Sequence, residues 1–108
     1  MVEKASRLKI TVLRRFKPEE VFKTPPVDGP SLGACGLYND GQIFYVEQDG
    51  KMPNEFCGGA WDDIYKAIQV LRFHGNFQWF DEAGVSVSCC TDGLRPVVFK
   101  IERTHARS

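Results

Sequence analysis

Four cysteines are the residues of this 108-residue chain best suited to chemistry: Cys35, Cys57, Cys89 and Cys90. A thiolate is both a nucleophile and a ligand for soft metal ions. We expect the chain in the cytoplasm, where thiols stay reduced, so disulfides are not the first interpretation. Buried packing residues, metal ligands and redox groups all remain open for these four side chains.

Cys57 lies in the segment FCGGAWDD, just ahead of the longest predicted helix. The unpaired amides and the dipole at a helix N-terminus stabilise a thiolate. The two glycines that follow allow a ligand or metal to approach the backbone closely. Asp62 and Asp63 act in the opposite direction, because their negative charge favours the neutral thiol. We therefore predict a functional thiol here, with a small packing residue as the alternative.

Two adjacent cysteines end the segment VSVSCC, residues 85–90. Side chains alternate along a strand, so Cys89 shares a face with two valines and Cys90 shares the other face with two serines. The pattern predicts diverging thiols, with Cys89 in the core and Cys90 as the functional candidate. A disulfide between neighbours is disfavoured, because it closes a strained ring against the trans peptide.

A metal centre is one function that these thiols could serve. Cys35, Cys57 and Cys90 could converge on zinc or another thiophilic ion, with His74 or Cys89 as a fourth ligand. Structural zinc sites usually draw their ligands in close-spaced pairs, and the chain contains no CxxC segment. The leading hypothesis is therefore broader: Cys57 and Cys90 bind a soft metal or a small electrophilic ligand, and Cys35 assists.

An enzyme with an aromatic pocket is the second hypothesis. Trp61, Phe77 and Trp79 would form the walls around a small organic substrate, and polar contacts could come from Tyr38, Tyr45 and Tyr65. Arg95 could hold a carboxylate, with a solvated turn residue as the alternative.

In that enzyme Cys57 would be the nucleophile and His74 the base. The two residues lie at opposite ends of the predicted helix, roughly 20 Å apart at 1.5 Å per residue. They could therefore meet only across a subunit interface of a homo-oligomer. A third hypothesis is a structural or interaction module with inert thiols.

The elements that must position these residues follow from hydrophobic periodicity. Residues 7–15, 85–90 and 96–103 have the alternation of half-buried strands, and Asp92-Gly93 between the last two is a hairpin turn signal. The strand expected over 41–48 carries apolar side chains on both faces, which indicates burial on both sides.

The main helix is expected over residues 60–75, where apolar residues recur with helical spacing and Gly75 provides the stop. His74 would lie in its last turn. Pro18 predicts a single short helical turn within residues 16–22. The order predicts an α+β fold: a small, mostly antiparallel sheet of about four strands with one main helix. We expect one domain over 1–108, frayed at 1–6 and 104–108.

Composition narrows the function classes. Lys+Arg and Asp+Glu are both 14, so no charge excess draws the chain to nucleic acid or anionic lipid. A chain with little net charge has little electrostatic repulsion between copies, which suggests a homo-oligomer. No apolar run approaches the roughly 20 residues of a membrane helix, and the polar N-terminus has no apolar signal core.

Three blocks of sequence resemble a known family: KITVLRR, KMPNEFCGGAWDDIY and CCTDGLRPVVFKIER. They are similar to a family of short, uncharacterised conserved bacterial proteins of about a hundred residues. The resemblance covers nearly the whole chain and implies a standalone protein without implying an activity. The family pattern has a Cys-Pro pair where this chain has Cys35-Gly36, so a role carried over to Cys35 is the least secure.

Overall fold

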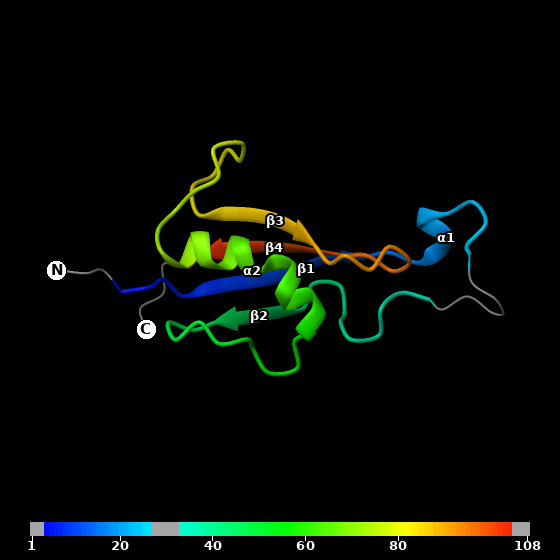
Figure 1. Cartoon of the computed structure of the whole chain (residues 1–108), viewed down its shortest axis with the longest axis horizontal. Helices are drawn as coiled ribbons and strands as arrows, with labels where there is room; N and C mark the ends of the chain where they lie inside the picture. Colours follow the sequence, from blue (N-terminus) through cyan, green and yellow to red (C-terminus); the bar gives the residue numbers. More distant parts are fainter. Residues whose placement is uncertain (1–3, 27–32, 105–108) are drawn as a thin grey trace.

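The computed structural model describes residues 4–26 and 33–104. It contains a four-stranded sheet in the order β2-β1-β4-β3, with every neighbouring pair antiparallel (Figure 1). The elements are β1 (Leu8–Arg15), α1 (Pro18–Val21), β2 (Ile43–Val46), α2 (Gly58–Arg72), β3 (Val85–Cys89) and β4 (Val97–Arg103). The predicted small α+β fold with one main helix is confirmed, as is the single helical turn that begins at Pro18.

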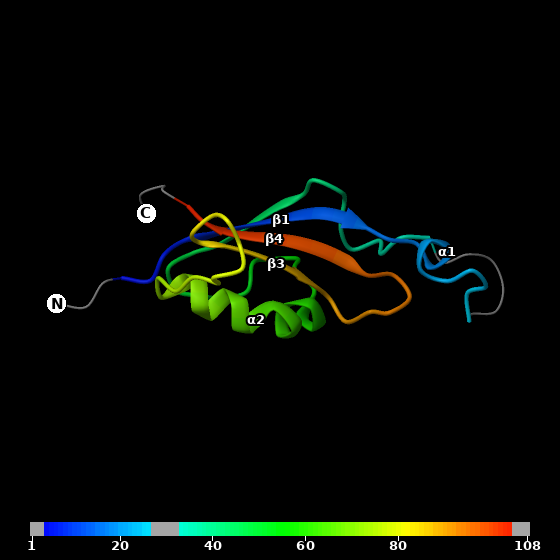
Figure 2. The ribbon, with the colours of Figure 1, turned by 90° about the horizontal axis from the view of Figure 1, so that it is seen from above.

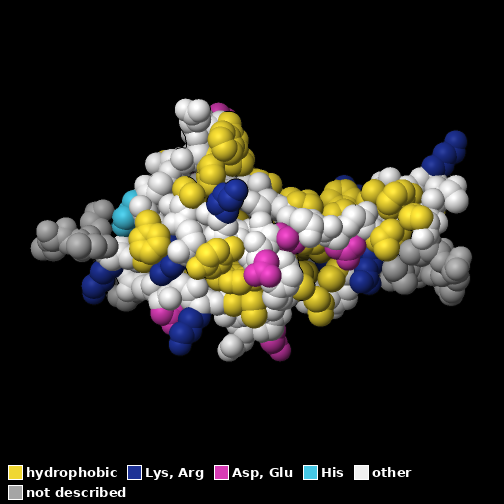
Figure 3. Space-filling model, in the orientation of Figure 1, with side chains coloured by type: hydrophobic (Ala, Val, Ile, Leu, Met, Phe, Trp, Pro, Cys, Tyr) yellow, Lys and Arg dark blue, Asp and Glu magenta, His cyan; other side chains and the backbone are white. Residues whose placement is uncertain are grey.

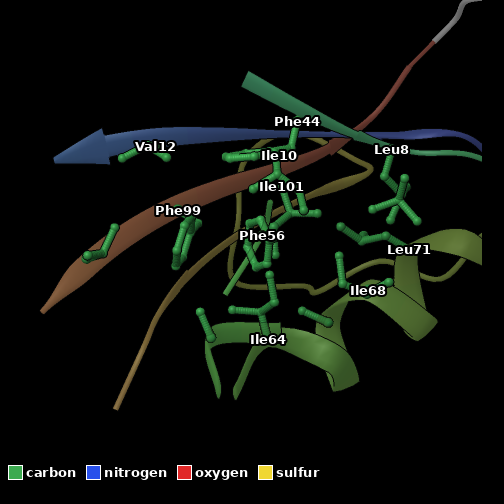
Figure 4. Close-up of a cluster of buried hydrophobic side chains, with 14 of the residues drawn as sticks. Leu8, Ile10, Val12, Phe44, Phe56, Ile64, Ile68, Leu71, Phe99 and Ile101 are labelled. Atoms are coloured by element: carbon green, nitrogen blue, oxygen red, sulfur yellow. The ribbon is translucent and has the colours of Figure 1, made fainter. Parts of the chain in front are cut away.

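The hydrophobic core lies between the sheet and α2, which covers one face of the sheet (Figure 2). Alternate residues of β1 and β4 point toward the helix because strand side chains alternate. Residues of α2 at helical spacing meet them. The core side chains labelled in Figure 4 come from these three elements, from β2 and from the loop before α2: Leu8, Ile10, Val12, Phe44, Phe56, Ile64, Ile68, Leu71, Phe99 and Ile101.

The expectation that the second strand is buried on both faces was wrong. Phe44 and Val46 are buried, whereas Ile43 and Tyr45 are 45% and 40% exposed. β2 is an edge strand, and α2 covers only one face of the sheet. Apolar residues on both faces of a strand therefore did not imply a second covering layer.

The main helix is shifted toward the N-terminus relative to the prediction. It begins at Gly58, with Cys57 as N-cap, and it ends at Arg72. The first turn contains no acidic residue, so the prediction that Asp62 and Asp63 lie in the first turn was wrong.

The helix ends with a cap in which His74, and not Gly75, takes the left-handed conformation (φ 70°). His74 N donates to the Leu71 carbonyl and Gly75 N donates to the Val70 carbonyl, which is the Schellman pattern. A Cβ on Gly75 would lie 2.8 Å from a Val70 methyl carbon, so close approach requires glycine there. The placement of His74 in the last helical turn was wrong.

The hairpin of β3 and β4 is confirmed, but the assignment of the faces of β3 was wrong. Ser88 pairs with the core residue Phe99, whereas Cys89 pairs with Val98. Residues that pair across a sheet share a face, so the serines and Cys90 lie on the core side and Cys89 points outward. Cys89 is exposed, as a residue of the uncovered face should be.

The described ends of the chain are hydrogen-bonded. Ser6 N donates to the Arg72 carbonyl, and Thr104 N donates to the Arg7 carbonyl. Fraying predicted for residues 1–3 and 105–108 concerns positions outside the described residues. The part of the prediction that covers residues 4–6 and Thr104 receives no support from these contacts.

Charged side chains of both signs are interspersed over the α2 face (Figure 3). Hydrophobic side chains gather on the lobe formed by the loop between α2 and β3, where Trp79 is 71% exposed. Within the described ranges, no helix combines the length and apolar character needed to cross a membrane.

Candidate functional site

A cavity of about 280 Å³ lies at the N-terminal end of α2. Its wall includes three of the four cysteines, which come from three separate parts of the chain. The lining side chains that could act as nucleophiles, acids, bases or charged ligands include Cys35, Tyr38, Cys57, Asp63, Cys90 and Arg95. The convergence of Cys35, Cys57 and Cys90 that the sequence suggested is therefore found around one cavity.

Cys57 is positioned by the first turn of α2. As N-cap it has extended backbone angles, and its carbonyl accepts the first helical hydrogen bond from Trp61 N at 2.9 Å. Its side chain makes no capping hydrogen bond, and the thiol lies 3.9 Å from where a Cβ of Gly59 would be. Half-buried Cys57 thus lies at the N-terminus of the helix, where the first amides have no carbonyl partners within the helix.

Tyr38 anchors the floor of the cavity. Its ring is 3% exposed and contacts Phe44, Phe56 and Phe99 at centroid distances of 5.8, 5.5 and 5.4 Å. The hydroxyl oxygen accepts a hydrogen bond from Cys57 N at 3.0 Å. The core therefore fixes a hydroxyl group directly beneath the helix start.

Burial raises the pKa of Tyr38 from its ordinary value of 10.0 to about 12. Charge on the nearby sulfurs of Cys57, Cys35 and Cys90 is a smaller part of the same rise in pKa, since a phenolate and a thiolate repel each other. The Cys57 amide works in the other direction but does not cancel these effects. The phenol is therefore neutral near pH 7, and it lies within electrostatic reach of all three sulfurs.

Cys90 is held at the turn end of the β3–β4 hairpin. Its amide donates to the Val97 carbonyl at 3.1 Å, and Val97 N donates to the Cys90 sulfur at 3.3 Å. The next residue, Thr91, donates its amide and its hydroxyl to the carboxylate of Asp63 on α2. The helix that presents Cys57 is thus tied directly to the loop that presents Cys90.

Cys35 is held by the end of β1. Arg15 donates from Nη1 to the Cys35 carbonyl at 3.0 Å. The same guanidinium and the Arg15 amide both donate to Asp40, at 3.1 and 3.0 Å. Arg15 therefore joins the loop that carries Cys35 to the sheet.

Arg95 contributes a cation to the cavity wall. Asp92 accepts the amides of Leu94 and Arg95, which shapes the turn after β3. The Nε atom of Arg95 is buried without a hydrogen-bond partner, and the nearest carboxylate oxygen of Asp92 is 3.8 Å away. The turn thus presents a guanidinium whose donors are incompletely used.

The predicted pairing of Cys57 with His74 does not occur within one chain. His74 lies beyond the far end of α2 from Cys57, where its Nε2 donates to the Lys4 carbonyl at 2.9 Å. It is not among the residues that line the cavity. The pairing of Cys57 with His74 still needs a neighbouring subunit, and both that pairing and the homo-oligomer stay predictions.

The predicted aromatic wall is divided between two places. Trp61 packs against Phe56 and Tyr65 on the surface of α2. Phe77 and Trp79 contact each other beside a second cavity, between α2 and β3. The thiol cavity is lined by none of Trp61, Tyr65, Phe77 and Trp79, so the structure does not combine them with Cys57.

All four cysteines are free thiols. Among residues 4–26 and 33–104, no group of three or more His, Cys, Asp or Glu side chains is arranged to hold a metal ion. Cys35, Cys57 and Cys90 therefore share a cavity in this structure without forming a coordination sphere. Cys89, the possible fourth ligand, lies on the outer face of the sheet.

Comparison with known proteins found no matching family model, curated protein or solved structure.

Sequence reasoning missed two residues that build this site. Asp63 was considered only as a helix charge, although it binds a residue 28 positions away. Arg15 was not among the candidate site residues, although it holds the Cys35 loop. Neither contact has a local sequence signal, because both join segments that are distant in the chain.

Proposed function

We propose that the cavity binds a small electrophilic ligand through Cys57 and Cys90, with Cys35 assisting. The observation that carries this proposal is the meeting of three half-buried thiols from three segments around one cavity. Packing alone would account for one small sulfur in such a place. Three thiols, a tyrosine hydroxyl and an arginine in one cavity wall could together supply a nucleophile, a hydrogen-bond donor and a cation for a ligand.

Cys57 is the proposed nucleophile, because it lines the cavity as the N-cap residue of α2. The free amides and the dipole at a helix N-terminus favour negative charge that develops there. Attack on a carbonyl carbon forms a sulfur–carbon bond and breaks the C=O π bond. The proton of the thiol ends on the former carbonyl oxygen, so this addition consumes no oxidant or reductant.

Tyr38 is the proposed donor to the oxygen on which charge develops. Its oxygen already accepts the Cys57 amide, and within the described ranges its own proton has no acceptor. A neutral phenol beside the sulfur can therefore donate a hydrogen bond to the adduct. Cys90 and Cys35 would bind the ligand from the other sides of the cavity.

A soft metal ion is the alternative ligand for the same thiols. It would require Cys35, Cys57 and Cys90 to move together, because the described residues contain no preformed coordination group. Elemental analysis of protein purified without tags or chelators tests this alternative. Stoichiometric zinc or another thiophilic metal that protects these thiols would favour it over the electrophile.

The test is alkylation by iodoacetamide under native, metal-free conditions, followed by mass spectrometry of each cysteine. The Cys89→Ser background removes the exposed thiol, which should behave like any accessible cysteine. We expect Cys57 to react faster than glutathione despite being half-buried, and we expect Cys57→Ser to abolish that phase. A Cys57 that reacts more slowly than glutathione would mean that the thiols are inert packing residues.

A further inference from the structure

We propose that the ligand of this cavity carries a carboxylate, and that Arg95 holds it. This inference rests on the proposed function, because it concerns the same cavity and the same Cys57 nucleophile. The observation behind it is the partly exposed side chain of Arg95 in the cavity wall, whose buried Nε has no hydrogen-bond partner among the described residues. A buried donor without a partner is unfavourable, so a small shift of this side chain that pairs its donors with a ligand is stabilised.

Guanidinium geometry favours a carboxylate over other acceptors. Its planar donors match two carboxylate oxygens, and such charge-assisted pairs are stronger than neutral hydrogen bonds. Arg95 is the sole Lys or Arg among the described residues that line the cavity. An anionic group that enters would therefore be held at this side chain.

The two acidic residues of the wall do not saturate Arg95. Asp63 accepts the amide and the hydroxyl of Thr91. Asp92 accepts the amides of Leu94 and Arg95 in the turn, and its other oxygen forms an ion pair with Arg95 Nε at 3.8 Å, beyond hydrogen-bonding distance. The guanidinium therefore keeps donors for the carboxylate of a ligand.

The size of the cavity limits the ligand to a small acid. Its volume of about 280 Å³ is at or below the lower end of the roughly 300–1,000 Å³ typical of ligand pockets. With the carboxylate at Arg95, the electrophilic carbon would face Cys57. Short oxo acids and short unsaturated acids have both groups within a few bonds, so they are the substrate class that we infer.

The experiment compares iodoacetate with iodoacetamide, two alkylating probes of nearly equal shape that differ in charge. Both react by displacement: the sulfur–carbon bond forms, iodide leaves, and the thiol proton passes to the buffer. The rate ratio of iodoacetate to iodoacetamide is measured at Cys57 in the Cys89→Ser background and divided by the same ratio for glutathione. We expect a corrected ratio of about ten, on the order of one charge-assisted hydrogen bond.

The matched variants are Arg95→Gln and Arg14→Gln. The first should lower the corrected ratio to about one, and because the ratio is taken within one variant, a general change in Cys57 reactivity does not enter it. The second removes an exposed arginine whose partner is Glu20, and it should leave both rates unchanged. If Arg95→Gln unfolds, Arg95→Lys keeps the charge without the planar fork, and an intermediate ratio supports the assignment.

The outcomes separate the two proposals. A Cys57 that reacts rapidly with iodoacetamide but has a corrected ratio near one overturns the carboxylate and leaves the thiol function standing. A high ratio that persists in folded Arg95→Gln, or that is undiminished in Arg95→Lys, overturns the role of this arginine fork. A Cys57 that is slow with both probes overturns the proposed function itself, and this inference with it.

Discussion

Replacing Tyr38 by phenylalanine tests how the cavity is built. The substitution keeps the ring and its contacts with Phe44, Phe56 and Phe99. It removes the hydroxyl oxygen that accepts the Cys57 amide at 3.0 Å. The amide that begins α2 would then lack its partner beneath the helix.

The expected cost follows from that single lost acceptor. Leaving a buried amide unsatisfied costs about 1–3 kcal/mol, and entry of water would bring the value to the lower end. For a domain of this size each 1 kcal/mol lowers the melting temperature by about 4–8 °C. We therefore expect Tyr38→Phe to lower the free energy of unfolding by about 1–2 kcal/mol.

The assay is urea unfolding in reducing buffer, followed by the fluorescence of Trp61 and Trp79. Tyr65→Phe is the matched control, because Tyr65 is 44% exposed and its hydroxyl should contribute less than about 0.5 kcal/mol. The slope with urea should stay constant, so that the midpoint shift reports stability alone.

A Tyr38→Phe variant with the urea midpoint of the wild type would refute this reasoning. It would mean that the bond to Cys57 contributes nothing, and that another contact fixes the helix start. A midpoint shift equal to that of Tyr65→Phe would lead to the same conclusion.

The remaining predictions concern pH, the tie between helix and hairpin, and one glycine. The pKa of Tyr38 is raised in the folded protein, so its contribution to stability is complete below about pH 10 and is lost between about pH 10 and 12. The urea midpoint of the wild type should therefore fall more steeply over this pH range than that of Tyr38→Phe. Equal slopes of midpoint against pH for the two proteins would contradict the raised pKa. Asp63→Asn should lower the free energy of unfolding by about 1 kcal/mol and change the alkylation rate of Cys90, because it weakens the hydrogen bonds to Thr91 in the loop after β3. Asp62→Asn should change neither quantity. Gly75→Ala should cost about 1–3 kcal/mol, because its Cβ would overlap the last turn of α2, whereas Gly93→Ala meets open space; equal melting temperatures for the two variants would argue against the clash.

Local pattern predicted most of the fold. The alternation in β1 and β4, the helical spacing in α2 and the Asp92-Gly93 turn are short-range signals, and each element formed where its signal lies. These signals act through side chains a few residues apart, so one sequence contains them in full. The end of the helix was less accurate because the left-handed cap at His74 depends on how the chain packs after the last turn.

Pattern could not say which face of a strand would be buried. The two valines of β3 suggested that Cys89 would enter the core, yet pairing with β4 places Cys90 on that side. β2 likewise has apolar side chains on both faces, and only its position at the edge of a sheet with one covering helix exposes Ile43 and Tyr45. Register and layer order are decided by contacts between distant segments.

The candidate site shows the same division. The sequence by itself determined the chemical groups, and it placed Cys57 at a helix start and Cys90 at a strand end. Only the tertiary structure decided that both face one cavity with Tyr38 and Arg95, and that His74 and the aromatic residues do not. The physical reason is that hydrogen bonds such as Asp63 to Thr91 and Arg15 to Cys35 join segments far apart in the chain, where residue spacing has no information about distance.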